Sequence, residues 1–556
     1  MSETSTRSKR LVVVGGGMVA HRLVEAMVDR DTAGEWRVDL FAEESRAPYD
    51  RVALTTFFSG RDPEDLLLGD AGLWRRDGVR LHTNSPVRAI DTAARQVHAR
   101  GRVYDYDALV LATGSSAAVP PVAGSDLPGC FVYRTVDDVT ELRAWAHDRA
   151  AELDRPVRGA VVGGGLLGLE AAGALTAMGV DSTVVEFAPR LMPLQVDEGG
   201  GESLRRLIGQ LGVTVRTSTA TSKVKAGRNG RVSRMDFTDG EKLPVDLVVF
   251  ATGVRPRDEL ARDAGFEVGE RGGVVVDDTC AVAGAEDVYA VGEVACIQGR
   301  TWGLVGPGNT MAEVVVDRLL GGEATFPGAD TSTKLKLLGV DVASFGDVFA
   351  ASPGSLEVVY ADPVAGVYKK LVVSDDAQTL LGGVLVGDAS AYASLRPLVG
   401  SPLGSDPTAW LLPEGAAPAA GADLPDDANV CSCNNVSAGA IRCAVTEQGC
   451  TDLAGVKACS KAGTSCGSCL PLVKKLMTTE LERSGVEVSN ALCEHFAVSR
   501  AQLFDIVRVT GLRTFSEIIA AHGTGRGCDI CRPVAASILS SLGTCLLYTS
   551  PSPRDS

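Results

Sequence analysis

Near its start the chain reads Leu11-Val-Val-Val-Gly15-Gly-Gly17-Met-Val-Ala20, which predicts a buried strand, a glycine turn and the opening of a helix. Gly15 permits the tight turn, Gly17 lets the backbone approach a pyrophosphate, and the small Ala20 lets the helix pack on the strand. The pyrophosphate would lie at the helix N-terminus, where free N–H groups favour an anion. A second strand ends near Glu43, which could accept hydrogen bonds from a ribose. A single stretch of this kind also occurs for packing reasons alone.

The pattern recurs 148 residues later as Ala160-Val-Val-Gly163-Gly-Gly165-Leu-Leu-Gly168-Leu-Glu170, again in the order strand, turn and helix. Its second strand ends at Glu186, 23 residues after the first glycine. A carboxylate there repels a 2′-phosphate, so NADH is favoured over NADPH. Two matches in the correct context predict two dinucleotide-binding domains.

Two further segments share one sequence pattern. Each is a predicted buried strand that ends in Ala-Thr-Gly, a small-residue turn that brings the backbone close to a dinucleotide. A later strand ends in a glycine and a carboxylate. The candidate binding residues of these segments are Ala112, Thr113, Gly114, Gly253, Gly292 and Glu293.

Together these motifs resemble the flavoprotein disulfide reductase superfamily, whose fold is an α/β two-dinucleotide-binding-domain (Rossmann-like) flavoprotein. The resemblance implies FAD at the first glycine motif, NAD at the second, and a flavin ribityl hydroxyl at Glu293, where the superfamily usually has Asp. A strand-rich stretch follows, and it resembles the small α+β domain that caps the flavin in the same superfamily. Its expected strands are 335–339, 356–360, 367–373 and 380–386.

The region where this superfamily places its reactive cysteines holds none. Its disulfide reductases carry a cysteine pair shortly after the first ribose acid, whereas residues 42–54 of this chain contain no cysteine. Electrons are therefore expected to leave by another route than a thiol beside the flavin. Arg51 in this stretch could stabilise a reduced anionic flavin, or be an exposed loop arginine. Arg51 and Glu170 are the candidate catalytic residues.

Composition limits the class of partner. The 556 residues are too many for one core, and 45% of them are hydrophobic. The formal charge of −16 argues against nucleic acid or an anionic membrane as a partner. The first apolar run, 11–14, is too short for a signal peptide, and no run is long enough to span a bilayer, so a cytoplasmic protein is expected.

The cysteines concentrate at the C-terminal end: eleven of the fourteen follow residue 430. Cys431-Ser-Cys433 is followed, after 32 intervening residues, by Cys466-Gly-Ser-Cys469. Such pairs can give each iron of a [2Fe–2S] cluster two thiolates, and zinc is the main alternative. The spacing resembles the [2Fe–2S] domain of the bacterioferritin-associated ferredoxin type. The pattern predicts helices capped by Ser437, opened by Thr451 and starting around Pro471.

A shift of 62 residues reveals an internal repeat of this module. It aligns Cys431 with Cys493, puts His495 in place of Cys433, and aligns the second cysteine pair with Cys528 and Cys531. Three thiolates and an imidazole can hold zinc or a second [2Fe–2S] cluster. The alternative is a decayed copy that is kept for packing.

The order of motifs resembles the large subunit of assimilatory NADH-dependent nitrite reductase over essentially residues 8–542. The phrases that carry it are Gly16-Gly-Met-Val-Ala-His, Pro48-Tyr-Asp-Arg-Val, Leu335-Lys-Leu-Leu-Gly-Val-Asp-Val-Ala-Ser-Phe-Gly-Asp and Leu492-Cys-Glu-His-Phe. In that family the chain continues into a sirohaem and [4Fe–4S] domain that reduces nitrite to ammonia. That domain's cluster signature is absent from this sequence, and residues 543–556 break the helical pattern, so a truncated chain with a non-native tail is expected.

The resemblance implies the NADH-oxidising, electron-transferring part of such an enzyme, with NADH as partner, nitrite reached through the missing domain, a small subunit or separate reductase domain as partner, and a homodimer as a further alternative. A stand-alone reductase that feeds a separate nitrate reductase, and a redox sensor or scaffold with zinc modules, stay open. The expected boundaries are 8–120 with 254–325 for FAD, 121–253 for NAD, 326–411 for the cap, 412–428 for a linker, 429–485 for the [2Fe–2S] domain, 490–542 for the second module and 543–556 for the tail.

Overall fold

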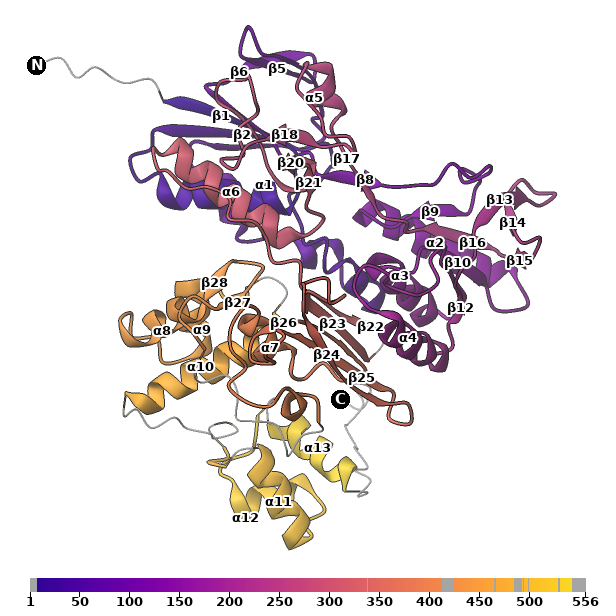
Figure 1. Cartoon of the computed structure of the whole chain (residues 1–556), viewed down its shortest axis with the longest axis vertical. Coiled ribbons are helices and arrows are strands. Elements are labelled where there is room, and N and C mark those ends of the chain that lie inside the picture. The colour runs from indigo at the N-terminus through magenta and orange to yellow at the C-terminus, as the bar shows by residue number, and fades with distance from the viewer. Residues whose placement is uncertain are drawn as a thin grey trace, which may run out of the picture.

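The computed structural model describes residues 8–337, 339–412, 424–464, 467–484, 493, 495–498, 500–528 and 531–542. Figure 1 shows two sheet-containing lobes in its upper half, a β-sheet below them, and two groups of helices toward the C-terminal end of the chain. Among the described residues, no helix combines the length and the apolar character that crossing a membrane requires.

The first dinucleotide domain is built on a parallel sheet in which the predicted N-terminal strand is central. This strand carries a continuous apolar run instead of alternating apolar and polar residues, because helices cover the sheet. Residues 11–14 are almost completely buried. The sheet order is β19 (Val288–Ala290), β7 (Ala108–Leu111), β1 (Lys9–Val14), β2 (Trp36–Phe41) and β3 (Val79–His82).

Two helices far apart in the sequence, α1 (Met18–Arg30) and α6 (Val305–Leu319), pack side by side beneath this sheet (Figure 1). Ion pairs join them at their solvent side, including Arg30 with Asp317 at 2.5 Å. Smaller elements complete the domain: β4 (Val87–Asp91), β5 (Gln96–Ala99), β6 (Arg102–Asp105), β18 (Val274–Val276), β20 (Ala295–Ile297), β21 (Arg300–Thr301) and α5 (Glu259–Asp263).

The second dinucleotide domain repeats the plan. Its sheet order is β12 (Thr214–Arg216), β11 (Asp181–Val185), β10 (Arg158–Val162), β16 (Leu247–Phe250) and β9 (Cys130–Val132), all parallel. Around it lie α2 (Val136–Glu152), α3 (Leu166–Ala177), α4 (Glu198–Gln210) and the antiparallel β13 (Thr221–Ala226), β14 (Val232–Phe237) and β15 (Lys242–Pro244).

The chain passes between the two domains along a pair of antiparallel strands. It leaves the first domain through β8 (Ser115–Ala117) and returns through β17 (Val254–Pro256). These strands directly follow the two Ala-Thr-Gly turns, so both turns lie at the junction. The second domain is thus inserted into the first, while the exact boundaries given above stay a prediction.

The capping domain is a five-stranded antiparallel sheet. Its order is β22 (Thr333–Leu337), β23 (Val340–Gly346), β26 (Leu380–Val386), β25 (Val367–Val373) and β24 (Leu356–Asp362), with α7 (Tyr392–Leu395) beside it. The predicted first strand ended at Gly339, but this glycine, with φ +97°, belongs to the turn between β22 and β23. β23 was not predicted, because its Asp341, Ser344 and Gly346 interrupt the apolar pattern.

The cysteine-rich end forms two helical modules. The first contains β27 (Asn429–Cys431), β28 (Val436–Ser437), α8 (Ala438–Thr446), α9 (Leu453–Ser460) and α10 (Leu470–Arg483). Ser437 caps α8 as predicted, whereas α9 is capped by Asp452 rather than opened at Thr451. The second contains α11 (Arg500–Thr510), α12 (Phe515–His522) and α13 (Cys531–Ser541), around a core of its own.

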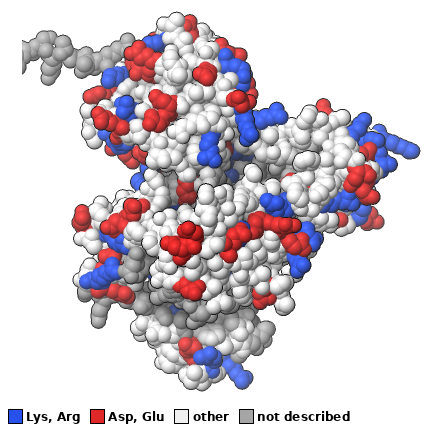
Figure 2. All heavy atoms as spheres, in the orientation of Figure 1, with Lys and Arg blue, Asp and Glu red and all other residues white. Residues whose placement is uncertain are grey.

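The predicted fold class, two Rossmann-like domains with a cap and C-terminal helical modules, is confirmed. Most of the predicted linker, residues 413–423, and the predicted tail, 543–556, lie outside the described residues. Figure 2 shows acidic and basic side chains interspersed over the visible face, with no uniformly basic surface there.

Candidate functional site

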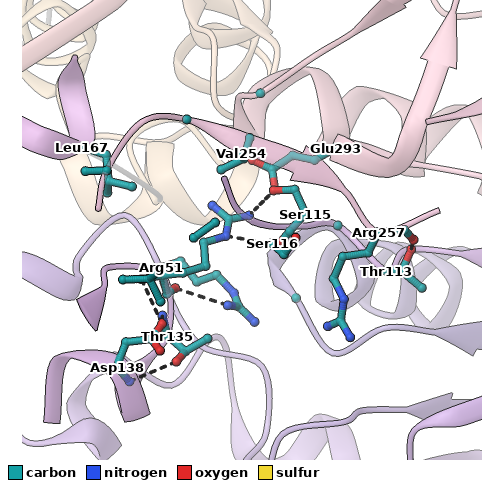
Figure 3. Close-up of a pocket in the computed structure, with 18 of the residues that line it drawn as sticks. Arg51, Thr113, Ser115, Ser116, Thr135, Asp138, Leu167, Val254, Arg257 and Glu293 are labelled. Atoms are coloured by element: carbon teal, nitrogen blue, oxygen red, sulfur yellow. Dashed lines mark hydrogen bonds and ion pairs between the residues drawn. The ribbon is translucent and has the colours of Figure 1, made fainter. Parts of the chain in front are cut away.

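One large cleft of about 1620 Å³ lies between the two dinucleotide domains. Most of the predicted binding residues line it, although they come from distant parts of the sequence. Figure 3 shows Leu167 of the second domain on one side of the view and Thr113 and Arg257 on the other. The predicted residues that line the cleft are Gly15, Gly17, Glu43, Arg51, Ala112, Thr113, Gly114, Gly163, Gly165, Glu170, Glu186, Gly253, Gly292 and Glu293.

The glycines divide into those that need a tight turn and those that leave room for a ligand. Gly15 has φ +124°, and a Cβ there would lie 2.0 Å from the carbonyl oxygen of Ala112; Gly163 has φ +113°. A Cβ on Gly17 or Gly165, in contrast, would meet no protein atom within 4 Å. The second glycine of each motif therefore faces open space, as close approach of a pyrophosphate requires.

The two motif helices offer free backbone donors at this place. Gly17 is the N-cap of α1 and Gly165 the N-cap of α3, and neither end has a side-chain cap. Their first N–H groups thus remain available to an anion. Ala20 and Gly168 lie behind the turns and serve packing: a Cβ on Gly168 would lie 1.9 Å from the carbonyl oxygen of Gly163.

The two predicted ribose acids end their strands as expected, but each already has partners. Glu186 accepts hydrogen bonds from the backbone N–H groups of Gly164, at 2.5 Å, and Ala188, at 2.6 Å. Glu43 forms an ion pair with Arg257, which lies on the turn after β17. Arg257 also lines the cleft and was missed from sequence, although it follows the second Ala-Thr-Gly turn by only four residues.

Glu293 is held by Ser115 and Arg134, which lie where the chain passes from the first dinucleotide domain into the second. Ser115 donates a hydrogen bond to its Oε2 at 2.7 Å, and Arg134 forms an ion pair with the same oxygen. Arg134 also donates to Ser115 Oγ at 2.8 Å, so the three side chains make one group; Figure 3 shows Ser115 and Glu293 facing each other. Arg134 was missed because nothing local marks it. It directly precedes Thr135, whose capping box starts α2 and fixes the turn.

Arg51 is not an exposed loop arginine. Its side chain is 21% exposed and forms an ion pair with Glu44, and it donates to the carbonyl oxygen of Arg134 at 3.4 Å. Glu44 is shared with the buried Tyr49, whose hydroxyl donates to it at 2.8 Å. This pairing keeps a cation at the wall of the cleft.

Glu170 stands on α3, between the two domains. Its carboxyl lines the cleft but is largely covered by protein. Burial raises the pKa of this carboxyl to about 7. A carboxyl with that pKa is protonated in about half of the molecules near neutral pH, so it can either donate or accept a hydrogen bond there.

The first cysteine module brings its three described candidate ligands together. Cys431, Cys433 and Cys469 line one small pocket, while Cys466 lies outside the described residues. The backbone N–H of Gly463 points at Cys431 Sγ from 3.5 Å, a contact typical of cluster thiolates. Two of these cysteines are buried, with 2% of Cys431 and 7% of Cys469 exposed. These features fit an iron–sulfur cluster.

This pocket adjoins the first dinucleotide domain through α6. Asn309 on α6 donates from Nδ2 to the carbonyl oxygen of Cys433 at 2.9 Å. A Cβ on Gly306 would lie 2.8 Å from the carbonyl oxygen of Ser432, so the two backbones are in direct contact. Val305, the first residue of α6, lines the cleft. One turn of helix thus separates the cleft from the cysteine loop.

In the second module all four predicted ligands meet. The ligand atoms of Cys493, His495, Cys528 and Cys531 all lie within 4.8 Å of one another. Among the described residues outside the first module, this is the group of side chains whose geometry could hold a metal ion.

Comparison with protein families agrees with this geometry. The model of pyridine nucleotide-disulphide oxidoreductases matches residues 9–314, that of rubredoxin NAD+ reductase C-terminal domains residues 332–401, and that of BFD-like [2Fe-2S] binding domains residues 429–479. The chain belongs to the pyridine nucleotide-disulphide oxidoreductase family. The predictions of FAD, NADH and one [2Fe–2S] cluster, and of an oxidoreductase, are confirmed.

Among individual proteins, the chain is 46% identical over 540 residues to the large subunit of NADH nitrite reductase from Escherichia coli (strain K12). This match covers 96% of the chain but 63% of that subunit, so the chain spans less than two thirds of its length. It is 31% identical over 551 residues to an assimilatory nitrate reductase electron transfer subunit from Bacillus subtilis (strain 168), covering 96% of the chain and 68% of that protein. The predicted resemblance to nitrite reductase large subunits is confirmed.

The fold has solved counterparts. The structure of an NAD-dependent persulfide reductase from A. fulgidus matches with a TM-score of 0.64, at 23% identity, over 75% of this chain and 81% of that one. At this identity the match supports the fold alone.

Proposed function

We propose that the chain is the part of an assimilatory nitrite reductase that oxidises NADH and passes the electrons through an iron–sulfur cluster toward a nitrite-reducing domain. The observation that carries the proposal is the contact between Asn309 and Cys433. It joins the cluster loop to the same helix whose first residue lines the dinucleotide cleft. Electrons from the cleft would have a short route outward that needs no cysteine beside the flavin.

The residues of the chain have separable tasks in this function. When bound, FAD supplies an acceptor for two electrons that can release them singly, and a [2Fe–2S] cluster takes up one at a time. Arg51, held by Glu44, places a positive charge at the cleft wall, where developing negative charge is stabilised. Leu167 covers the second-domain side of the cleft and helps exclude water.

We assign Glu170 to the nicotinamide end of bound NADH. Its raised pKa gives a carboxyl that can donate a hydrogen bond to a carbonyl group or accept one from an amide near neutral pH. We assign Glu186 to the ribose of NADH. Its carboxylate disfavours a 2′-phosphate and makes NADH the preferred donor. Glu43, with Arg257, is assigned to the ribose of FAD, and Glu293, with Arg134 and Ser115, to the flavin ribityl chain.

An anaerobic NADH titration of the purified chain tests the proposal. We expect the flavin absorbance to bleach and an iron–sulfur signal to appear by electron paramagnetic resonance, with reduction of ferricyanide but not of nitrite. Bleaching without a reduced cluster would contradict electron transfer to the cysteine module. No bleaching would contradict NADH oxidation altogether and favour a sensor or scaffold.

A second candidate acceptor has its own support. The chain is similar over 96% of its length to a protein named as an assimilatory nitrate reductase electron transfer subunit. A separate nitrate reductase would then take the electrons. Mixing the reduced chain with a purified nitrate reductase subunit, or with a separately expressed sirohaem domain, distinguishes the two acceptors by which product forms, nitrite or ammonia.

The cellular compartment and the partners follow from the same proposal. We infer a cytoplasmic enzyme, because NADH is its electron donor and its iron–sulfur ligands are thiols that need a reducing compartment. A small subunit or a separate reductase domain would be its partner, and a homodimer stays an alternative. Size-exclusion chromatography with light scattering measures the mass in solution and tests the homodimer.

A further inference from the structure

The second helical module brings four ligand side chains into one compact group. Cys493 and His495 come from one loop, and Cys528 and Cys531 from the loop that leads into α13. Within 4.8 Å of one another, their sulfur and nitrogen atoms surround a single point rather than an extended cavity. The group shares no residue with the cleft or with the pocket of the first module.

The distances within the group have the size that one tetrahedral ion imposes. Sulfur ligands at about 2.3 Å from an ion at the centre of a tetrahedron lie about 3.8 Å apart. Cys528 Sγ and Cys531 Sγ are 3.8 Å apart, and so are Cys493 Sγ and His495 Nδ1. In a [2Fe–2S] cluster, in contrast, the ligands of one iron lie across two bridging sulfides from those of the other. The 3.8 Å pairs fit either centre, but a spread of at most 4.8 Å over all four ligand atoms is too small for ligands on two different irons.

We propose that the second module holds one structural zinc ion, bound by Cys493, His495, Cys528 and Cys531. Three thiolates and one imidazole are a donor set typical of closed zinc sites, and with all four positions filled by protein no place remains for a substrate. The ligand set of the second module differs in this way from that of the first, because His495 stands where the first module has Cys433.

The backbone around the site is arranged to hold these ligands. Thr524 N–H donates to the carbonyl oxygen of His495 at 2.9 Å, which ties the two ligand loops together. Cys528 N–H points at Cys531 Sγ from 3.1 Å and would stabilise its thiolate. A Cβ on Gly525, where φ is +68°, would lie 3.1 Å from the imidazole of His495, so the glycine makes room for the ring.

The module also needs such an ion for its stability. Among its described residues, eight buried side chains form the core, and one of them is the ligand Cys531. Domains of about 50 residues bury too little apolar surface to be stable with a wide margin, and a structural metal commonly supplies the difference.

Metal analysis of the tag-free, cluster-containing full chain tests this proposal. We expect two irons, two acid-labile sulfides and one zinc per chain, with the zinc retained after dialysis against a chelator. Four irons without zinc would overturn the proposal in favour of a second cluster. Two irons without zinc would overturn it in favour of a decayed copy.

Variants locate the ion. We expect His495→Ala and Cys531→Ser to lose zinc while keeping two irons, and growth with cobalt to give the wild type the absorption bands of a tetrahedral cobalt thiolate. His522→Ala is the matched control, because His522 is an exposed histidine of the same module. If His495→Ala does not fold, the cobalt spectrum of the wild type alone decides. Zinc retained in His495→Ala, or lost in His522→Ala, would contradict the assignment.

A different pair of cysteines supports a second inference. Cys450 Sγ and Cys459 Sγ lie 3.1 Å apart, closer than the 3.8 Å between Cys528 and Cys531. Cys450 lies in the turn before α9, and Cys459 near the end of that helix. A disulfide bond measures about 2.05 Å, so a movement of about 1 Å would join the two sulfurs.

The pair combines an accessible thiol with a covered one. Cys459 is exposed and Cys450 is buried. The hydrogen bond between them raises the pKa of the Cys450 thiol. Because Cys459 is the exposed member of the pair, it is the thiol that a reagent from solvent reaches first. We infer that Cys450 and Cys459 form a reversible disulfide in exchange with low-molecular-weight disulfides such as glutathione disulfide.

The exchange balances in two steps. The Cys459 thiolate attacks one sulfur of glutathione disulfide, forms a mixed disulfide and releases one glutathione thiolate. The Cys450 thiol then loses its proton to water and attacks Cys459 Sγ, which forms the protein disulfide and releases the second glutathione. Two electrons pass from the cysteine pair to the small disulfide, and a dithiol reductant reverses both steps.

The cross-link would act on the cluster loop. It ties both ends of α9 together, and the residues that directly follow this helix contact the loop. The carbonyl oxygen of Lys461 accepts a hydrogen bond from Asn434 at 2.6 Å, and Gly463 N–H points at Cys431 Sγ. Oxidation would therefore restrain the backbone that supports a cluster ligand.

Peptide mapping of the cluster-containing protein after exposure to glutathione disulfide tests this inference. Trypsin cuts after Arg442, Lys457 and Lys461, so the disulfide would link peptide 443–457 to peptide 458–461, with a mass about 2 Da below the sum of the thiol forms. Cys443→Ser keeps Cys450 as the cysteine of the first peptide and should retain the link. Cys459→Ser should abolish it. A Cys443 link to Cys459, or free Cys450 and Cys459 after treatment, would overturn the inference.

Discussion

Asn309 Nδ2 lies 2.9 Å from the carbonyl oxygen of Cys433 and donates a hydrogen bond to it across the boundary between the first dinucleotide domain and the cluster module. Asn309 is 7% exposed, and its Oδ1 has no hydrogen-bond partner in the described part of the chain. Asparagine at this buried position therefore serves the contact to Cys433 rather than helix stability, because Asn is a modest helix former.

Asn309→Ala is expected to loosen this contact. The lost hydrogen bond costs about 1 kcal/mol of docking free energy, so cluster reduction should slow about fivefold while flavin reduction by NADH keeps its rate. Rapid-mixing absorbance at the flavin band and freeze-quenched electron paramagnetic resonance of the cluster measure the two steps. Asn229→Ala, in an exposed turn of the second domain, is the control. Equal slowing of both steps would mean that Asn309 acts on the flavin site instead.

The raised pKa of Glu170 gives a pH dependence with a definite sign. Burial raises the pKa of this carboxyl from 4.5 to about 7. Between these values the folded state binds the proton that the unfolded state has lost, so the free energy of unfolding decreases as the pH rises through that window. Glu170→Gln is neutral at every pH. We expect it to gain stability over wild type between about pH 5 and about pH 8, by up to about 3 kcal/mol.

The midpoint of thermal unfolding, followed by FAD fluorescence, measures this difference at several pH values. Glu198→Gln, an exposed substitution on α4, should show no pH-dependent gap from the wild type. A gap for Glu170→Gln that stays constant with pH would show that the effect is packing rather than titration.

The sequence predicted those parts of the molecule that depend on local pattern. The glycine motifs, the strands around them and the cap of α8 by Ser437 were recognisable because neighbouring residues fix them. Arg134 and Arg257 were not, because their roles arise when the crossing strands β8 and β17 bring distant segments together. The contact of Asn309 with Cys433, 124 residues apart, has no local signal at all. Glu170 was named from its motif, but its pKa depends on burial that only the folded cleft creates.

The preference for NADH should depend on Glu186. Its two hydrogen bonds, to Gly164 and Ala188, place the carboxylate at the end of β11 beside the glycine turn. Glu186→Ala should raise the KM for NADH about tenfold, equivalent to about 1.4 kcal/mol, and lower the KM for NADPH because the repulsion of its 2′-phosphate is removed. Initial rates with ferricyanide measure both constants. Glu202→Ala, on the exposed side of α4, should change neither. An equal rise for both nucleotides would argue that Glu186 only shapes the turn.

Arg134 should matter for FAD although it belongs to neither glycine motif. It holds Glu293 and Ser115 in one group, and both paired side chains are about one fifth exposed, so the pair is only partly screened by solvent. Arg134→Ala would leave the Glu293 carboxylate without its guanidinium at the position that we propose for the flavin ribityl chain. We expect a loss of about 2 kcal/mol in FAD binding, which corresponds to a Kd about 30 times higher.

Quenching of FAD fluorescence on adding flavin to the apoprotein measures that Kd. Arg134→Lys should recover part of the affinity, because an ammonium keeps the charge but lacks the planar guanidinium, whose Nη2 reaches Ser115 Oγ and Glu293 while its Nε reaches the carbonyl oxygen of Ser115. Arg228→Ala, in the exposed turn between β13 and β14, should bind FAD as the wild type does. If lysine restores nothing, the geometry of the guanidinium and not the charge of Arg134 fixes Glu293. If alanine changes nothing, Glu293 does not depend on Arg134 for its proposed place beside the flavin.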